Sequence, residues 1–205
     1  GVNLKKFKPN YSNSKKIVLM PSRVIKEKGV YEFIYAAKEV KKSFPKWNFY
    51  IAGTIDYNKK SSLSEKEFLK LKNIKEVIFL GYVKNMKNIY KKSSIVCLPS
   101  YREGFSKVFL EAAAMGIPVI TTTAIGCKDS IIPGKTGLLC KPKNVKSLEK
   151  SIKFLIKNKN TRLRYSKNAR QYALKNFDLN KVIFKNLEIY EKLLKNEKKI
   201  NLHRT

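Results

Sequence analysis

Acidic residues, histidine and cysteine are all scarce in this chain of 205 residues. Only 15 residues are Asp or Glu, against 45 Lys plus Arg, so the formal net charge is +30. The one histidine is His203, which excludes a His-based catalytic triad or a multi-histidine metal site within this sequence. Three cysteines, Cys97, Cys127 and Cys140, lack Cys-x-x-Cys spacing. An odd number of cysteines without that spacing indicates a reduced, cytosolic protein.

Long apolar runs are also missing. No stretch reaches the 18 apolar residues that a transmembrane helix needs, and the first ten residues lack the apolar segment of a signal peptide. Hydrophobic residues nevertheless make up 43% of the chain and aromatic residues 11%, which is enough for a sizeable core. A disordered basic tail is therefore excluded, and the length fits one α/β domain or one lobe of a larger enzyme.

Arginine is rare among the basic residues, since 39 of the 45 are Lys. Specific nucleic-acid readers favour Arg for bidentate base contacts, and the chain carries no zinc-finger, RNP or KH signature. An excess of Lys, Asn and Ile is what AT-rich coding produces. A second interpretation of the positive charge is attraction to an anionic membrane surface. Each Lys near the leaflet would contribute on the order of 1 kcal/mol to that attraction. A third interpretation of the charge is a basic domain that binds nucleic acid without a specific nucleic-acid partner.

Short apolar segments alternate with amphipathic ones along the chain. The expected strands are Lys16–Met20, Trp47–Ala52, Val77–Leu80, Ile95–Leu98 and Val119–Thr122, and the segment at 134–137 is expected to be a tight turn. The expected helices cover 30–40, 65–72, 85–92, 105–115 and most of the chain from Asn144 onward. This alternation predicts an α/β fold with a parallel sheet covered on both faces, a Rossmann-like doubly wound domain.

Ligands of such sheets bind beyond the carboxyl ends of the strands. The loops expected at that edge are 21–29, 53–57, 81–85, 99–106 and 121–129. Arg23 and Lys28 lie in the first of them, and two cations there suit a diphosphate, Arg as a fork and Lys as a point charge. A solvated basic loop in a Lys-rich chain is the alternative.

Two carboxylates separated by seven residues follow the fourth expected strand. Glu103 lies in the loop and Glu111 in the next expected helix, about 10 Å apart if the segment is helical throughout at about 1.5 Å per residue. Free backbone amides at Phe105–Lys107, at the start of this expected helix, would donate hydrogen bonds to an anion. The carboxylates suit sugar hydroxyls rather than phosphate, because like charges repel. The alternative is a helix cap and a surface glutamate.

Two weaker signals lie on neighbouring loops. The backbone at Tyr82 and Val83, after the third strand, could read the edge of a base, although a simple turn at the end of a strand is the commoner structure. The hydroxyl-rich loop Thr121–Asp129 could wall a sugar pocket or be a structural turn.

Several segments in this order resemble one known family. SRVIKEKG, FLGYV, LPSYREGFSKVFLEAAAMGIPVITT and GKTGLL are similar to the carboxyl-terminal lobe of retaining glycosyltransferases of family 4, which have the GT-B architecture. The start GVNLKKFKP resembles the linker between the two lobes. The resemblance implies an interlobe linker at 1–14, a nucleotide-sugar-binding domain at 15–178 and a C-terminal helix and tail at 179–205. It also implies that the amino-terminal lobe, which holds most acceptor contacts, lies outside this sequence.

The resemblance assigns roles to particular residues. The donor would be a UDP-sugar, and no metal would be needed. Glu103 would contact the transferred sugar near the reacting centre, together with Gly104 and Phe105, and Glu111 would bind the ribose. The diphosphate would be held by Arg23, Lys28, Ser106 and Lys107, and the base flanked by Tyr82 and Val83.

The TTTAIGCKD loop resembles TTDxPGCRE in bacterial enzymes that build capsule, O-antigen lipopolysaccharide and glycoprotein glycans on polyprenyl diphosphate. The resemblance therefore implies a hexose or N-acetylhexosamine donor and a saccharide or lipid-linked acceptor. It implies a cytoplasmic location, either free or peripheral at the inner face of the membrane. Thr123 and Ile125 replace the usual Asp and Pro, and Ser106 replaces a frequent Gly or Pro. A non-catalytic nucleotide-binding module is the alternative to an enzyme.

Overall fold

A computed structural model describes residues 1–9, 16–57 and 61–202, with side chains as far as Leu194. Residues 10–14 of the expected linker, and His203, lie outside the described residues. The strands are β1 (Ile17–Met20), β2 (Asn48–Ala52), β3 (Val77–Gly81), β4 (Ile95–Leu98), β5 (Val119–Thr122) and β6 (Gly137–Cys140). They form one parallel sheet in the order β3-β2-β1-β4-β5-β6.

This strand order confirms the predicted Rossmann-like fold. β1 lies in the middle, where Val18 pairs with Phe49 of β2 on one side and Ile95 of β4 on the other. Every residue of β1 and β4 is buried. Both faces of these strands are therefore covered, as their unbroken apolar sequences require.

Helices cover the two faces of the sheet. On one face α1 (Val30–Ser43) packs against α5 (Val145–Lys157), and on the other α4 (Lys107–Ala114) packs against α6 (Lys159–Asn176). Right-handed crossovers place α1 and α4 on opposite faces, because the strand order runs in opposite directions from the centre. Two shorter helices, α2 (Glu65–Lys72) and α3 (Met86–Lys92), flank β3 in the sequence.

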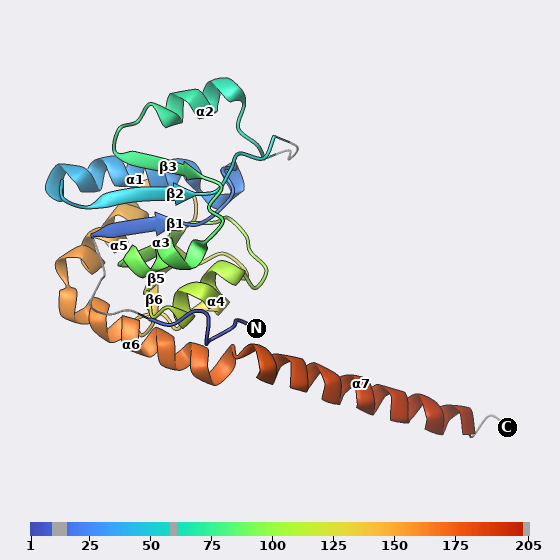
Figure 1. Ribbon diagram of the computed structural model, residues 1–205. Coiled ribbons are helices and arrows are strands. Elements are labelled where there is room, and N and C mark those ends of the chain that lie inside the picture. Colours follow the sequence, from blue (N-terminus) through green and yellow to red (C-terminus); the bar gives the residue numbers. More distant parts are fainter. Residues whose placement is uncertain (10–15, 58–60, 203–205) are drawn as a thin grey trace.

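The last helix, α7 (Leu179–Leu202), extends away from the rest of the domain (Figure 1). Eight apolar side chains in its described part are more than a third exposed; they are Leu179, Ile183, Phe184, Leu187, Ile189, Tyr190, Leu193 and Leu194. A helix this apolar on one side normally packs against another element. Within the described residues, α7 has little of this packing.

The first residues of the chain lie along α6. Val2, Leu4 and Phe7 are buried, and the Val2 amide donates to the Phe177 carbonyl at 2.7 Å. The Leu179 amide donates in turn to the Val2 carbonyl at 3.2 Å. Residues 1–7 are thus packed onto the domain. The division into a linker, a nucleotide-binding domain and a tail stays a prediction.

Arg170 of α6 holds this segment in place. Its guanidinium donates to the carbonyls of Phe7 at 2.9 Å, Ala114 at 2.7 Å and Leu4 at 3.4 Å. Ala114 is the last residue of α4, so the cation also satisfies a carbonyl at the negative end of a helix dipole. Three segments far apart in the sequence therefore meet at one side chain.

Two expectations about element boundaries were wrong. The expected turn is present at 134–136, but we assigned no strand after it, and β6 pairs there with β5 from Gly137 to Cys140. α4 begins at Lys107 rather than Phe105, because Ser106 is extended and the Phe105 ring packs against Phe177 with centroids 5.4 Å apart. The free amides at its start are therefore shifted toward Lys107, and the helical spacing assumed between Glu103 and Glu111 does not apply to the whole segment.

Candidate active site

The expected site residues lie at the carboxyl edge of the sheet. β1 and β4 are neighbours, but the chain proceeds from them in opposite directions, so the loops after them open away from each other. This is the switch point at which doubly wound sheets bind ligands. The loop after β1 carries Arg23 and Lys28, and the loop after β4 carries Glu103.

Arg23 forms an ion pair with a residue that we did not single out. Its guanidinium lies 2.6 Å from the Asp56 carboxylate, with side chains 50% and 21% exposed. Exposed pairs of this kind contribute little stability, so a stronger anion can displace the carboxylate at small cost. Asp56 follows β2 within the loop expected at this edge, but nothing in the sequence indicated its pairing.

Lys28 and Glu103 form the most buried ion pair of the site. The Lys28 ammonium lies 2.5 Å from Glu103 Oε1, and the two side chains are 20% and 7% exposed. The same oxygen accepts a hydrogen bond from the Ser100 hydroxyl at 2.6 Å. Ser100, fully buried, is a residue that sequence reasoning missed, although it lies in the quoted LPSYREGF segment.

The loop after β5 packs directly on the backbone around Glu103. The Glu103 amide donates to the Ile125 carbonyl at 3.2 Å. Gly126 has φ +75, in the left-handed region that favours glycine, and a Cβ there would lie 1.8 Å from the Glu103 carbonyl oxygen. The Thr122 hydroxyl donates to the Ser100 carbonyl at 2.6 Å. This loop therefore positions Glu103, while the Ile125 side chain is 76% exposed.

A hollow of about 230 Å³ brings together four of the expected residues, but not Lys28 or residues 103–107. Arg23, Tyr82, Val83 and Glu111 all line it, and they come from the loops after β1 and β3 and from α4. Its other lining residues are Pro21, Ser22, Ala52, Gly53, Met86, Tyr90 and Val108. Apolar walls with a few polar groups are typical of small-molecule sites.

Glu111 is a carboxylate in a partly apolar environment. Burial raises its pKa above the usual value, an effect that the Tyr90 hydroxyl and the cations Lys107 and Lys6 oppose. A desolvated carboxylate of this kind gains more from hydroxyl donors than a fully hydrated one does. Its position suits the diol of a ribose.

The start of α4 supplies further backbone donors beside Glu103. Ser106 precedes the helix, and its side chain makes no capping hydrogen bond to the described part of the chain. First-turn amides of a helix lack partners within the helix, and an anion can accept from them. A Cβ at Gly104 would meet no described atom within 4 Å, so internal packing does not account for glycine there. The Phe105 ring packs on Phe177, with centroids 5.4 Å apart, so this side chain is engaged within the domain.

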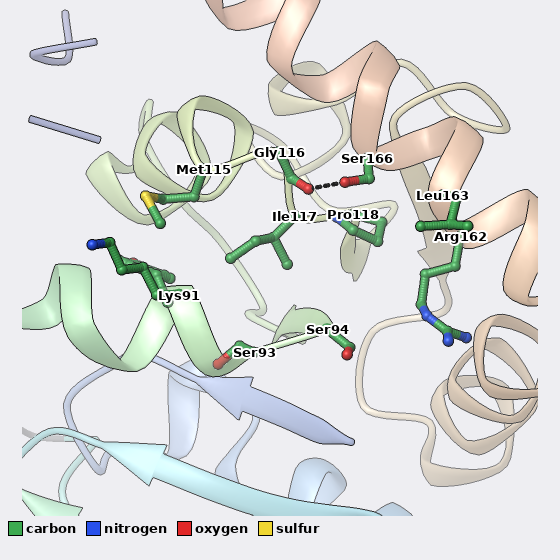
Figure 2. Close-up of a pocket in the computed structure, with 11 residues that line it drawn as sticks. Lys91, Ser93, Ser94, Met115, Gly116, Ile117, Pro118, Arg162, Leu163 and Ser166 are labelled. Atoms are coloured by element: carbon green, nitrogen blue, oxygen red, sulfur yellow. Dashed lines mark hydrogen bonds between the residues drawn. The ribbon is translucent and has the colours of Figure 1, made fainter. Parts of the chain in front are cut away.

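A second pocket, of about 40 Å³, lies at the opposite edge of the sheet (Figure 2). Ser93 and Ser94 precede β4 and Pro118 precedes β5, so these residues mark the amino-terminal ends of the strands. The Ser166 hydroxyl donates there to the Gly116 carbonyl, joining α6 to the end of α4 (Figure 2). This pocket is separate from the expected site residues.

The three cysteines are buried, with free thiols. Across residues 1–9, 16–57 and 61–202, no group of three or more His, Cys, Asp and Glu could hold a metal ion. In the same part of the chain, no helix is long and apolar enough to cross a bilayer.

Residues 2–172 match the family model described as "Glycosyl transferases group 1". The chain belongs to this glycosyltransferase family. A similar curated protein is the N,N'-diacetylbacillosaminyl-diphospho-undecaprenol alpha-1,3-N-acetylgalactosaminyltransferase of Campylobacter jejuni, 36% identical over 96% of this chain. The match covers 54% of that enzyme, so this chain spans about half the length of that relative.

Solved structures agree with the family membership. The C-terminal domain of a glycosyl transferase group 1 family protein from Francisella tularensis is 25% identical, with a TM-score of 0.75 over 87% of this chain and 100% of that domain. The Anabaena protein HepE, crystallised with UDP, is 22% identical, with a TM-score of 0.80 over 95% of this chain and 56% of that one. The second likeness bears on the fold alone. The predictions of a glycosyltransferase and of the GT-B type of fold are confirmed.

Proposed function

We propose that this chain is the donor-binding part of a retaining, family 4 glycosyltransferase that uses a UDP-sugar. The observation that carries the proposal is the arrangement at the switch point: Arg23 and Glu111 line a hollow with apolar walls, and Lys28 and Glu103 form an ion pair between the loops after β1 and β4. HepE was crystallised with UDP and with UDP-glucose, which supports the choice of donor.

In this proposal the diphosphate lies between the two basic side chains and the start of α4. Arg23 exchanges Asp56 for phosphate, and Lys28 stays between Glu103 and the phosphate. As the bond between the sugar and the diphosphate breaks, negative charge grows on the departing UDP. The two cations and the amides near Lys107 offset this charge in place, without a metal.

Glu103 contacts the sugar at the reacting centre. Its Oε1 is engaged by Lys28 and Ser100, so Oε2 is the oxygen left for a sugar hydroxyl. Gly104 and Phe105 contact the sugar through their backbone, and Glu111 holds the ribose. Transfer with retained configuration follows if the acceptor attacks from the face that UDP leaves.

The acceptor we propose is a saccharide, free or linked to a polyprenyl diphosphate. The Campylobacter jejuni relative is named for transfer onto a diphospho-undecaprenol saccharide, which supports this class. The donor sugar would accordingly be a hexose or N-acetylhexosamine. The site of action would be the cytoplasm, with the basic surface attracted to anionic lipid at the membrane.

Most acceptor contacts in this proposal come from a second lobe. The relatives are about twice as long as this chain, and the exposed apolar side of α7 needs a packing partner. We therefore expect the chain alone to bind nucleotide sugar and to transfer poorly. Turnover by this chain at the rate of a two-lobe enzyme would contradict that expectation.

Titration calorimetry with UDP tests the donor proposal, and a thermal-shift screen of nucleotide sugars would rank the donors. Heat of binding that is abolished in Arg23→Ala plus Lys28→Ala supports it. A folded protein that gives no heat with millimolar UDP would falsify it. A non-catalytic nucleotide module remains the second candidate, since it would bind UDP equally well; transfer by the two-lobe enzyme, lost in Glu103→Gln, separates the two.

A further inference from the structure

One polar group at the hollow has no role in the function proposed above. Tyr90 of α3 is 1% exposed, and its hydroxyl has no hydrogen-bond partner within the described part of the chain. A buried hydroxyl normally finds a partner, and one without a partner costs free energy and calls for an explanation. No such explanation comes from packing, because the phenol could be a phenylalanine without loss of ring contacts.

The position of Tyr90 points to that explanation. Its side chain lines the same hollow as Arg23, Val83 and Glu111. The ring is fixed from behind by Phe7, with centroids 6.4 Å apart in an edge-to-face contact. Tyr90 is thus a buried residue that lines the proposed nucleotide site and also the pocket in Figure 2.

Glu111 is the polar group that Tyr90 faces. Burial is the main cause that raises the pKa of the phenol, and the Glu111 carboxylate raises it further. The hydroxyl in turn is the leading group that lowers the pKa of Glu111. The two groups therefore influence each other across the hollow, although they lie outside normal hydrogen-bond geometry in the unliganded protein.

We propose that Tyr90 is a positioning residue for Glu111, donating its hydroxyl proton to one carboxylate oxygen when a ribose occupies the hollow. The other oxygen is then directed at the ribose 2′- and 3′-hydroxyls, which donate to it. The proposal rests on the proposed function, since it requires a nucleotide in this hollow. The ligand that this proposal requires carries a vicinal diol close to a diphosphate.

The test is calorimetry with UDP and with 2′,3′-dideoxy-UDP, on this chain and on Tyr90→Phe, Glu111→Gln and the double variant. Losing one hydrogen bond to a charged group should weaken UDP roughly tenfold in Tyr90→Phe. Dideoxy-UDP, which lacks both hydroxyls, should bind Tyr90→Phe and the unsubstituted chain alike. The double variant should bind UDP no more weakly than Glu111→Gln, because Tyr90 acts through that carboxylate.

Tyr165→Phe is the matched control, since Tyr165 is also buried but lies on α6, away from the hollow. It should leave the binding of both ligands unchanged. Three outcomes would each overturn the positioning role while leaving the proposed function intact. They are an unchanged UDP affinity in Tyr90→Phe, an equal loss of affinity for both ligands, and additive effects in the double variant. A folded, unsubstituted chain that binds no UDP would instead overturn both.

Discussion

At the residue scale, the Glu103 carboxylate is held by two donors of different kinds. Lys28 brings a charge and Ser100 a neutral hydroxyl, and both engage Oε1. Lys28 also faces the proposed diphosphate, so its removal would change donor binding and positioning together. Ser100 is buried behind Glu103 and offers a cleaner separation of the two effects.

We expect Ser100→Ala to slow sugar transfer by a two-lobe enzyme roughly tenfold, because one hydrogen bond that orients Glu103 is lost. The affinity for UDP should hardly change, since UDP has no sugar for Glu103 to contact. Steady-state kinetics and UDP calorimetry measure the two quantities. Ser151→Ala, on α5, is the control. A loss in UDP affinity as large as the loss in rate would contradict the assignment.

The pH dependence of UDP binding should depend on Glu111. Its folded pKa is raised by burial, and ribose hydroxyls bind the ionised form. UDP affinity should therefore fall as pH drops through this raised pKa. The stability that Glu111 contributes to the unliganded protein has the opposite sign: it is present in full below the unfolded pKa and is lost as pH rises through the folded one.

Calorimetry between about pH 5 and 8 on the unsubstituted chain and on Glu111→Gln measures this effect. The phosphate of UDP also titrates in this range, and it does so equally for both proteins. The difference between the two profiles therefore isolates Glu111. Identical pH profiles of UDP affinity for the two proteins would contradict a role of Glu111 ionisation in UDP binding.

Sequence reasoning predicted the residues that project from strand ends, but not their partners. Arg23, Lys28 and Glu103 were singled out because strand-end loops of a parallel sheet converge on one edge, and Glu111 because it lies in the helix that follows one of them. Pairings such as Arg23 with Asp56 join residues 33 positions apart, and they depend on loop conformations that the sequence pattern does not specify.

At the scale of elements, the boundaries of the fully buried strands were predicted best. β4 and β5 begin and end at the predicted residues, because short apolar runs bounded by polar ones define buried strands. β6 is as long as β4 and β5, but it begins with a glycine directly after a turn and only its first and last residues are buried, so its apolar signal was weaker. The start of α4 was misplaced because the Phe105–Phe177 contact, which keeps the preceding loop extended, is a long-range interaction.

Arg170 joins α6 to the end of α4 and to residues 4–7, and its replacement tests this junction. Arg170→Met keeps much of the apolar stem but leaves three carbonyls without their donor. We expect a loss of about 1.5–3 kcal/mol in the free energy of unfolding, measured by urea denaturation. Arg164→Met, on the same helix, should change it by less than about 0.5 kcal/mol. Equal effects of the two substitutions would refute the special role of Arg170.

At the scale of the whole molecule, the charge of +30 is spread over a surface rich in Lys. Nothing in the sequence singled out a nucleic-acid site, and the site that the fold assembles suits a nucleotide sugar instead. Binding to nucleic acid should therefore be weak and blind to sequence.

Fluorescence anisotropy with several unrelated DNA and RNA oligonucleotides tests this expectation. Their affinities should agree with one another, and they should fall by orders of magnitude as salt rises from about 50 to 200 mM, as counterion release requires. UDP binding should survive the same change, because its contacts are local and partly buried. Tight binding to one sequence at the higher salt would revive the nucleic-acid interpretation.

The contact between Gly126 and the Glu103 backbone limits which substitutions this loop of the chain can accept. A methyl group at position 126 would clash with the Glu103 carbonyl oxygen, whereas the Ile125 side chain beside it is exposed. In the proposed donor site, substitutions at Thr123 and Ile125 would therefore be free to change the contacts to the sugar, while position 126 has to stay glycine. The exposed position 125 and the constrained position 126 are thus neighbours in one loop.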